Sequence, residues 1–259
     1  MKLKSIFKKI KIKSGDKIIV TANIIKILSK FKKKEINFDP NIFLNELKRY
    51  VGKNGTIFIP TYNWDFCNGK TFHYKKTRSQ SGSLGNIALK RKDFTRSYNP
   101  IYSMAISGKD MKKICNQKHT DCFSLNSPFG YLLKNKGKNI FIDTRPRWKG
   151  ETKLTGFIFH HIVEQAVGVA DRYFKKFSGK YINKKKIKKN INIKFYVKDL
   201  SFKYKVYISK KIEQTLRKKK LIKQTSIKGI NINIINLYET YKILKTDLKT
   251  KNQYFLKKH

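Results

Sequence analysis

Two side chains able to move a proton stand close together in an apolar stretch of this sequence. His161 and Glu164 lie three residues apart within the segment 156–167, and His160 lies four residues before the same carboxylate. On a helix both spacings place an imidazole beside the glutamate, so spacing alone does not choose between the histidines. A carboxylate fixes the tautomer of its histidine and stabilises the imidazolium, which suits a general base near neutral pH. The alternative is a structural His–Glu hydrogen bond in a buried core.

The cysteines offer a second candidate chemistry. Cys67 could act as a nucleophile with His73 nearby in sequence, but nothing places a base beside it, and we favour a packed or exposed thiol. The three cysteines of the chain are odd in number and lack the paired spacing of a zinc site. We therefore expect reduced thiols in a cytoplasmic protein and no metal. His73 and His119 are expected to be solvated loop residues.

The chain is strongly basic, with 61 Lys and Arg against 16 Asp and Glu and a net charge of +45. Such a charge would suit a nucleic-acid binder, because neutralised phosphates dominate that affinity. The lysine runs are scattered, however, and no zinc-finger, RNA-recognition or basic-zipper signature accompanies them. We interpret the charge as compositional bias on tolerant surface positions. It would still speed the capture of anions such as CoA or a nucleotide sugar.

The elements that must position these residues alternate between strand and helix. Strands are predicted at 17–21, 56–59, 104–107 and 140–143, with helices at 23–31, 41–51, 84–91 and 109–115 and another around Leu132. The tail predicts strands at 194–197, 203–208 and 231–235 and helices at 212–219 and 237–248. We expect an α/β fold with a central mixed sheet flanked by helices and a C-terminal α+β portion.

No linker divides the chain with clarity. A single domain is therefore expected over 1–259, with a basic N-terminal segment at 1–14 and a strand and helix subdomain at about 190–259. The basic start lacks the continuous apolar core of an export signal, and no apolar stretch is long enough to cross a bilayer. The sequence leaves the oligomeric state open.

Several motifs recur in an order that resembles the aminoglycoside 3-N-acetyltransferases, also called the antibiotic N-acetyltransferases. The resemblance runs from about Gly15 to the C-terminus and is closer to members associated with surface-polysaccharide genes. Its landmarks are Gly55-Thr-Ile-Phe-Ile-Pro-Thr61, Phe66-Cys-Asn-Gly69, Ser79-Gln-Ser-Gly82-Ser-Leu84, Arg96-Ser97-Tyr-Asn-Pro100-Ile-Tyr-Ser103, Ser127-Pro-Phe-Gly130 and His161-Ile-Val-Glu164.

The resemblance implies direct acetyl transfer from acetyl-CoA to an amine, with His161 as general base and Glu164 as its partner. It also implies CoA contacts from two parts of the chain, namely the end of the first strand at Thr21, Ala22 and Asn23, and the residues Arg96, Ser97 and Ser103. We expect the irregular segment 61–100 to face the sugar, with contacts from Asn63, Trp64, Asp65 and Ser79. Trp64 and Trp148 are equally compatible with sugar stacking and with core packing.

The chain departs from many aminoglycoside-modifying members at three places. Thr21-Ala22 stands where they carry His-Ser, Asn99-Pro100 where they carry His-Pro, and Ile158 where a Thr is frequent. These changes concern the oxyanion and CoA contacts and leave His161 and Glu164 intact. The Asn99-Pro100 version, Phe66-Cys-Asn-Gly69 and the Arg172-Tyr-Phe-Lys175 stretch resemble the members found with surface-polysaccharide genes, so an amino sugar, nucleotide-linked or a surface-glycan precursor, is favoured as substrate. The charge agrees, because a +45 surface should repel polycationic aminoglycosides unless the site itself is acidic.

Two alternative functions are retained. One is an aminoglycoside antibiotic 3-N-acetyltransferase, and the other is a non-catalytic protein that binds a sugar or nucleic acid. The commoner GCN5-type acetyltransferase fold is not expected, because Arg147-Trp-Lys-Gly150-Glu-Thr152 matches its pyrophosphate loop only in part. Gly82-Ser-Leu-Gly85 likewise lacks the ending of a P-loop.

Overall fold

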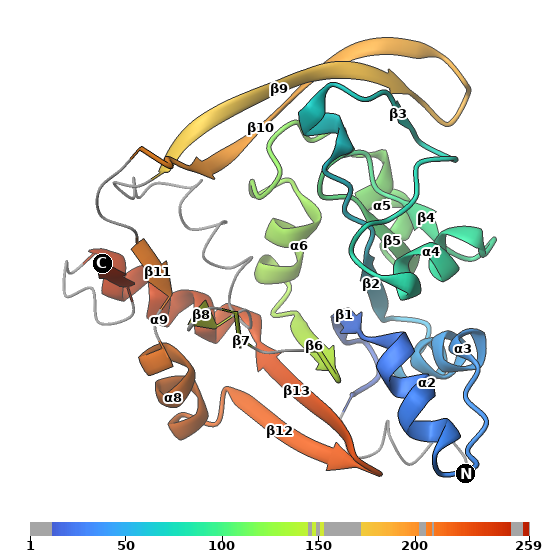
Figure 1. Cartoon of the computed structure of the whole chain (residues 1–259), viewed down its shortest axis with the longest axis vertical. Helices are drawn as coiled ribbons and strands as arrows, with labels where there is room; N and C mark the ends of the chain where they lie inside the picture. The colour runs from blue at the N-terminus through green and yellow to red at the C-terminus, as the bar shows by residue number, and fades with distance from the viewer. Residues whose placement is uncertain are drawn as a thin grey trace.

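A seven-stranded mixed sheet forms the centre of the molecule in a computed structural model, which describes residues 12–144, 147–148, 151–152, 172–201, 206–208, 210–249 and 256–258 (Figure 1). Three neighbouring strands run parallel, namely β6 (Lys138–Ile142), β1 (Lys17–Ala22) and β2 (Thr56–Pro60). Antiparallel strands extend both edges, with β5 (Met104–Gly108) and β4 (Thr95–Arg96) beside β2, and β13 (Ile230–Asn236) and β12 (Ile222–Ile227) beside β6.

Helices cover both faces of this sheet, because the strands are apolar on both sides. On β1, Ile18 and Val20 point into one core and Ile19 points into the other, as expected for successive strand residues. The first core holds the apolar faces of α2 (Ile24–Lys32), α3 (Pro40–Val51) and α4 (Ser83–Lys90). The second holds side chains of α5 (Met111–Asn116), α6 (Pro128–Lys134), α8 (Lys210–Lys218) and α9 (Leu237–Lys249). The predicted fold class is therefore confirmed.

Three helices that border the sheet begin at side-chain caps. Asn23 accepts a hydrogen bond from the Lys26 amide at the start of α2, and Asp39 accepts one from Asn41 at the start of α3. Ser127 caps α6 by accepting from the Gly130 amide. Such caps satisfy amides that have no partner inside the helix and typically contribute about 1 kcal/mol each. None of the helices in the described ranges is both long and apolar enough to span a bilayer.

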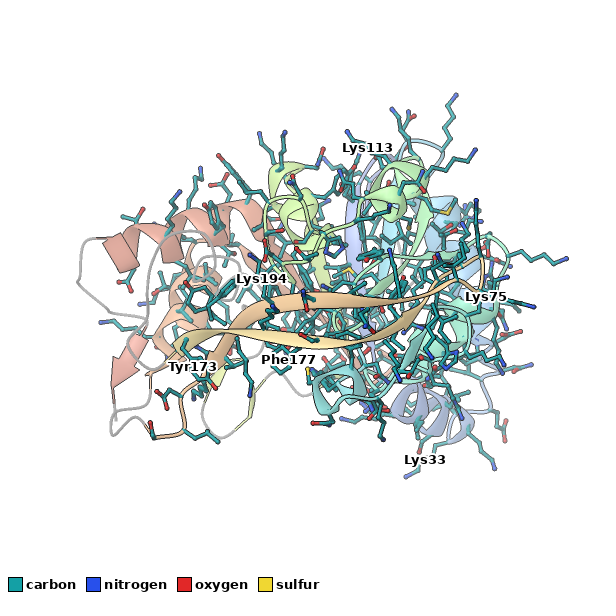
Figure 2. All side chains as sticks on the ribbon, turned by 90° about the horizontal axis from the view of Figure 1, so that it is seen from above. Lys33, Lys75, Lys113, Tyr173, Phe177 and Lys194 are labelled. Carbon is teal, nitrogen blue, oxygen red and sulfur yellow. The ribbon has the colours of Figure 1, made fainter. Side chains whose placement is uncertain are left out.

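A long β-hairpin arches over one side of the molecule (Figures 1 and 2). It consists of β9 (Arg172–Ile182) and β10 (Lys188–Lys198), and the short strand β3 (Phe72–His73) pairs with β9 near the hairpin tip. Gly179 lies against the ring of Phe66, from which an added Cβ would stand only 2.8 Å. Phe66 belongs to the single 3₁₀ turn η1 (Asp65–Asn68), so the hairpin packs directly on the segment predicted to face the sugar.

Short strand pairs complete the described part of the chain. β7 (Arg147–Trp148) pairs with β8 (Glu151–Thr152), and β11 (Val206–Ile208) pairs with β14 (Leu256–Lys258). The described ends of the partial match to a pyrophosphate loop, Arg147–Trp148 and Glu151–Thr152, form the β7–β8 pair.

The predicted elements of the first half are confirmed with shifts of a few residues at their ends. In the second half the alternating pattern at 194–197 marks only the last part of β10, and β9 and β12 were not predicted. β9 was missed because it is mostly exposed and carries lysines, serine and glycine, so that it lacks apolar alternation. Its partner β10 and the turn between them supply the hydrogen bonds that make it a strand.

Candidate active site

The strand ends bring the predicted contact residues to one edge of the sheet. β1, β2 and β6 are parallel, so their carboxyl ends at Ala22, Pro60 and Ile142 lie at the same edge. β5 runs the opposite way and begins opposite Pro60, and β4 ends with Arg96 opposite Ala105 of β5. In open α/β sheets ligands bind outside the carboxyl ends of the strands. This edge therefore unites residues that are up to 120 positions apart in the sequence, from Ala22 to Ile142, and it is the candidate active site.

The ends of β1 and β6 form the first part of the edge. The Asn23 amide donates to the Ile142 carbonyl at 3.0 Å, which joins the start of α2 to the end of β6. The buried carboxylate of Asp143 pairs with Lys30 of α2 at 2.8 Å. Beside it, the buried hydroxyl of Thr144 has no hydrogen-bond partner among the described residues. This part of the edge thus holds a capped helix N-terminus and a free hydroxyl donor.

Arg96 ties the loops after β2 to the start of β5. Its side chain is 3% exposed, and its Nε donates to the Ser103 hydroxyl at 3.0 Å. Nη2 donates to the Thr61 carbonyl at 3.1 Å, and Nη1 donates to the carbonyls of Thr77 at 2.5 Å and Tyr74 at 3.4 Å. We call this set of hydrogen bonds the Arg96 clasp. Burial lowers the pKa of this guanidinium to about 10, so it remains charged at neutral pH.

The clasp continues into neighbouring hydroxyl groups. Ser103 donates to the Thr61 carbonyl at 2.9 Å, and the two hydroxyls lie 2.9 Å apart. Ser97 accepts the Met104 amide, and the Tyr74 phenol donates to the Arg96 carbonyl. The resemblance assigns Arg96, Ser97 and Ser103 to CoA. All three are buried, and their side chains already form hydrogen bonds within the protein.

Asn63 and Ser79 shape the loop that follows β2. The Asn63 side chain accepts from the Asp65 amide and donates to the Arg78 carbonyl, so both of its ends are used. The Ser79 hydroxyl accepts from the Ser81 amide. An added Cβ on Gly85 of α4 would lie 2.4 Å from the Pro60 carbonyl, so the helix packs against the end of β2 without room for a side chain. These residues position the loop rather than extend into solvent.

Trp64 and Asp65 are the members of the predicted sugar set that reach solvent. Trp64 is 40% exposed, and the Asp65 carboxylate is partly exposed with Lys70 at 3.4 Å. The Trp64 ring makes edge contacts with Tyr62 and Tyr102, at centroid distances of 6.3 Å and 6.4 Å. An aromatic wall next to a carboxylate suits the apolar face and the charged amine of an amino sugar.

Sequence reasoning missed three contributors to this edge. Tyr62 and Tyr102 form the wall with Trp64, and the alternation Tyr62-Asn63-Trp64 after a strand was the signal available for the first of them. Thr144 has no such signal, because its place at the edge depends on β6 lying beside β1.

The predicted catalytic pair lies outside the described residues. His161, Glu164 and the alternative His160 belong to the range 153–171, so their roles stay predictions. The side chain of Trp148 is also outside the described set. His119 is described, and the prediction of a solvated loop residue is wrong for it, since it is 5% exposed. Its loop is covered because the neighbouring residue Thr120 accepts a hydrogen bond from Lys194 of the hairpin.

The three cysteines are free thiols, and the environments of Cys67 and Cys115 keep these two protonated. Burial raises the pKa of the Cys67 thiol to about 11 and that of Cys115 to about 12. A thiolate is the nucleophilic form, so a raised pKa argues against either cysteine as a nucleophile at neutral pH. Within the described ranges, no group of three or more His, Cys, Asp and Glu side chains could hold a metal ion.

Lysines lie on several sides of the described surface (Figure 2). Figure 2 shows Lys33, Lys75 and Lys113 pointing outward from different sides of the molecule. This distribution agrees with the interpretation of the charge as compositional bias.

Comparison with known proteins places the fold. The structure is similar to AAC-IIIb in a binary complex with CoASH, with a TM-score of 0.72 and 15% identity over 96% of this chain and 95% of that chain. It is similar to AAC-VIa bound to sisomicin, with a TM-score of 0.71 and 12% identity over 94% of each chain. It is also similar to the YokD protein from Bacillus subtilis, with a TM-score of 0.68 and 16% identity over 92% of this chain and 94% of that chain. No curated protein matches the sequence.

The sequence profile of the aminoglycoside 3-N-acetyltransferases, the antibiotic N-acetyltransferases, matches residues 28–249. This match spans most of the chain, including the hairpin and most of both cores, and begins after β1 (Lys17–Ala22) and the Asn23 cap. The fold agrees with it and differs from the GCN5-type acetyltransferase fold. The protein belongs to the aminoglycoside 3-N-acetyltransferase family.

Proposed function

We propose that this protein transfers an acetyl group from acetyl-CoA to the amine of an amino sugar, nucleotide-linked or a surface-glycan precursor. The observation that carries the proposal is the convergence at one sheet edge. The predicted CoA contacts follow β1 and flank β4 and β5, and the predicted sugar contacts follow β2. All of these strand ends lie side by side. Family membership supplies the reaction class.

The edge has donors suited to the phosphates and amides of CoA. Thr21 is partly exposed at the end of β1, and the Thr144 hydroxyl is unpartnered among the described residues. The first amides of α2, those of Ile24 and Ile25, follow directly after the Asn23 cap. A helix N-terminus favours anions because its amides and its dipole both face the ligand. CoASH is present in the AAC-IIIb structure, which has the same fold.

Arg96 and Ser103 serve CoA indirectly in this proposal. The guanidinium is buried and already donates to three carbonyls and a hydroxyl, so it has little capacity left for a phosphate. Its role is to hold the loops beside the carboxyl ends of β2 and β5. Such positioning keeps reacting groups in a productive geometry, which is a major source of rate enhancement.

The transfer proceeds directly, without an acyl-enzyme. The amine nitrogen attacks the thioester carbonyl, and His161 accepts the proton that the nitrogen loses. The C–S bond then breaks, and the His161 imidazolium gives this proton to the leaving sulfur, which releases the CoA thiol. Glu164 stabilises the imidazolium formed in this step. General-base help of this kind is typically worth about 10² to 10⁴ in rate. The family resemblance of the His161-Ile-Val-Glu164 motif supports these roles.

An aminoglycoside is the second candidate acceptor. The fold match to AAC-VIa bound to sisomicin favours it, and the Asp65 carboxylate beside Trp64 would suit any cationic amine. The net charge of +45 opposes it, since a polycation is repelled by the surrounding field whereas a nucleotide sugar is attracted.

The test is release of free thiol from acetyl-CoA in the presence of single acceptors. Nucleotide-linked amino sugars and aminoglycosides are assayed in parallel, and the former are expected to give the higher kcat/KM. His161→Ala should lower kcat at least about 100-fold. His160→Ala is the matched control, because it removes the adjacent imidazole, and it should retain most activity.

Three outcomes would contradict the proposal. Undiminished release in His161→Ala removes the proposed base, and loss of release only in His160→Ala transfers that role to the neighbour. Absence of release with every amine favours the non-catalytic alternative. A binding function for nucleic acid would instead show stoichiometric affinity that falls steeply with added salt.

A further inference from the structure

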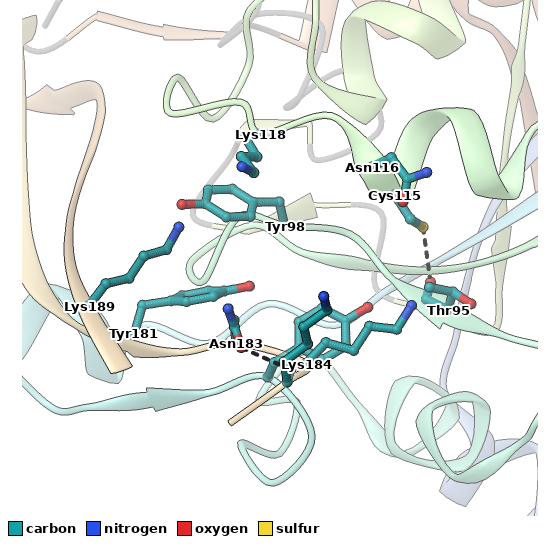
Figure 3. Close-up of a pocket in the computed structure, with 11 residues that line it drawn as sticks. Thr95, Tyr98, Cys115, Asn116, Lys118, Tyr181, Asn183, Lys184 and Lys189 are labelled. Carbon is teal, nitrogen blue, oxygen red and sulfur yellow. Dashed lines mark hydrogen bonds between the residues drawn. The ribbon is translucent and has the colours of Figure 1, made fainter. Parts of the chain in front are cut away.

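A pocket with a volume of about 330 Å³ lies where the hairpin tip meets β4 and α5 (Figure 3). Thr95 of β4 lines it, whereas the next residue, Arg96, forms the clasp at the candidate edge. Tyr74 also lines it and donates its phenol proton to the Arg96 carbonyl. The pocket is therefore separate from the edge but adjoins the same strand. We call it the hairpin pocket.

Cationic groups approach the hairpin pocket from two sides. Figure 3 shows Lys184 and Lys189 entering from the hairpin and Lys118 from the loop after α5. No Asp or Glu lines the pocket, and none of its four ammonium groups has a carboxylate partner among the residues described. These four are Lys118, Lys184, Lys185 and Lys189. Unpaired ammonium groups around a cavity form a site for an anion.

Aromatic rings make up the apolar part of the lining. The rings of Tyr98 and Tyr181 pack together with centroids 5.1 Å apart, and the Lys189 ammonium lies 5.6 Å from the centroid of Tyr98. Burial raises the pKa of both phenols, so they remain neutral and can donate hydrogen bonds. The Cys115 thiol donates a hydrogen bond to the Thr95 carbonyl, and burial keeps it protonated. It therefore does not supply the pocket with a thiolate nucleophile.

Size and chemistry together restrict the ligand. The volume stands at the lower end of the range for small-molecule sites, so the pocket suits a single nucleotide rather than an oligonucleotide. Ammonium and phenol groups can bind phosphate oxygens, and a tyrosine ring offers a surface on which a base can stack. A ligand that uses both kinds of group carries phosphates for the ammonium and phenol donors and an aromatic base for the tyrosine ring.

We infer that the hairpin pocket binds a nucleoside diphosphate through its four lysines and the face of Tyr98. This inference deepens the proposed acetyl transfer and rests on it for the source of the nucleotide, but nucleotide binding itself is measured without turnover. The same chemistry could belong to a nucleotide-linked sugar or to the ADP portion of CoA, and the choice of nucleotide separates these sources.

A second cavity of about 550 Å³ provides a matched control. Its lining includes Lys75, Lys76, Arg78 and Lys90 but no aromatic side chain. Lys75 and Lys76 are adjacent and exposed, as are Lys184 and Lys185 at the hairpin turn. Two double variants, each replacing one pair with serine, therefore remove the same charge from two cavities that differ in aromatic content.

The experiment is calorimetric titration of the full chain with UDP, ADP and inorganic pyrophosphate. UDP or ADP should bind at least about tenfold more tightly than pyrophosphate, a difference of roughly 1.4 kcal/mol. Lys184→Ser with Lys185→Ser should weaken nucleotide binding at least about tenfold, whereas Lys75→Ser with Lys76→Ser should leave it nearly unchanged. Tighter UDP binding identifies a nucleotide sugar as the source, and tighter ADP binding identifies CoA.

A further variant tests the ring. Tyr98→Leu keeps apolar volume but removes the aromatic face, so it should weaken nucleotide binding and leave pyrophosphate binding unchanged. The inference is overturned if neither nucleotide binds, if pyrophosphate binds as tightly as the nucleotides, or if both lysine variants weaken binding equally. Thermal unfolding of each variant verifies that it is folded. A failure of nucleotide binding would not change the result expected in the thiol-release assay, so the two proposals are tested independently.

Discussion

The loops at the candidate edge and the lining of the hairpin pocket are both polar, but they use their polar groups in opposite ways. At the edge, the donors of Arg96, Ser103 and Asn63 are bonded to the protein's own backbone and side chains. In the hairpin pocket, Lys184 and Lys189 approach open space without a carboxylate partner in the described part of the chain.

This difference shows which groups remain available for a ligand. Buried polar groups need partners, because an unsatisfied one costs about 1–3 kcal/mol or more if it is charged. A residue that resembles a binding residue in sequence can therefore be fully used in holding a loop. Exposed lysines need no internal partner and remain free to neutralise an anion. The clasp residues are thus used to hold the loops of the edge, which we call the frame, whereas the lysines of the hairpin pocket are available to an anion.

Removal of the clasp should give the largest effect. Arg96→Met leaves the buried carbonyls of Thr61 and Thr77 without their charged donor, and unsatisfied acceptors cost about 1–3 kcal/mol each, or about 3–5 kcal/mol together. The midpoint temperature of thermal unfolding should fall by about 10 °C, and the rate of acetyl transfer should fall with it. Arg49→Met, which removes an exposed guanidinium on α3, is the control and should change neither. Equal unfolding temperatures for Arg96→Met and wild type would show that the frame does not depend on the clasp.

Crowding at the frame should have the next largest effect. Gly85→Ala places a Cβ 2.4 Å from the Pro60 carbonyl, and this overpacking should lower the free energy of unfolding by about 2–3 kcal/mol. Because α4 must move away from the end of β2, kcat should fall while UDP binding at the hairpin pocket is retained. Gly69→Ala provides a contrasting control, since its Cβ would meet open space and only its positive φ of 78° opposes the change. A parallel loss of UDP binding in Gly85→Ala would mean that the two regions are one unit.

Acidification should test the attachment of the hairpin beside His119. Burial lowers the pKa of this imidazole from 6.5 to about 4, so the unfolded chain binds the proton more readily than the folded one. The contribution of the neutral, buried His119 to the free energy of unfolding is therefore fully present above pH 6.5 and is lost as the pH falls toward 4. The loss should reach about 2 kcal/mol by pH 5.

Denaturant titrations at pH 7.5 and pH 5 measure this loss. In His119→Leu the difference between the two pH values should shrink by the same amount, because the titrating group is absent. An unchanged pH dependence in that variant would assign the effect to other groups.

The smallest effect is expected at the residue shared by both regions. Tyr74→Phe removes the phenol that donates to the Arg96 carbonyl but keeps the ring that lines the hairpin pocket. The loss of one hydrogen bond should lower the unfolding free energy by about 1 kcal/mol. UDP affinity should change less than about threefold, which corresponds to well under 1 kcal/mol. A larger loss of affinity would show that the clasp controls the pocket.

Much of the fold could be predicted because local patterns and global packing agree. The buried strands β1, β2 and β5 are short apolar runs bounded by turn residues, and the helices α2 and α3 begin at Asn and Asp caps. Such signals depend on a few neighbouring residues. β9 carries no such signal, since its exposed lysines and Gly179 are explained only by pairing with β10 and by contact with Phe66.

For the candidate site, the sequence indicated which residues to consider but not what each is bonded to. Resemblance selected Arg96 and Ser103, the irregular segment 61–100 suggested Asn63 and Ser79, and the sheet brings all four to one edge. That the first two are bonded to Thr61 could not be inferred from the chain, because the partners are 35 and 42 residues apart. The hairpin pocket could likewise not be predicted from the sequence, since its lysines resemble every other lysine of a basic chain.

The sequence by itself determined the family, the α/β architecture and the ordered motifs, because these depend on residue type and local spacing. Only the tertiary structure decided which polar side chains are already bonded within the protein and which are available to a ligand. The physical reason is that a hydrogen-bond donor is free or used according to its neighbours in space. In this molecule those neighbours come from strands and loops that are distant in the chain.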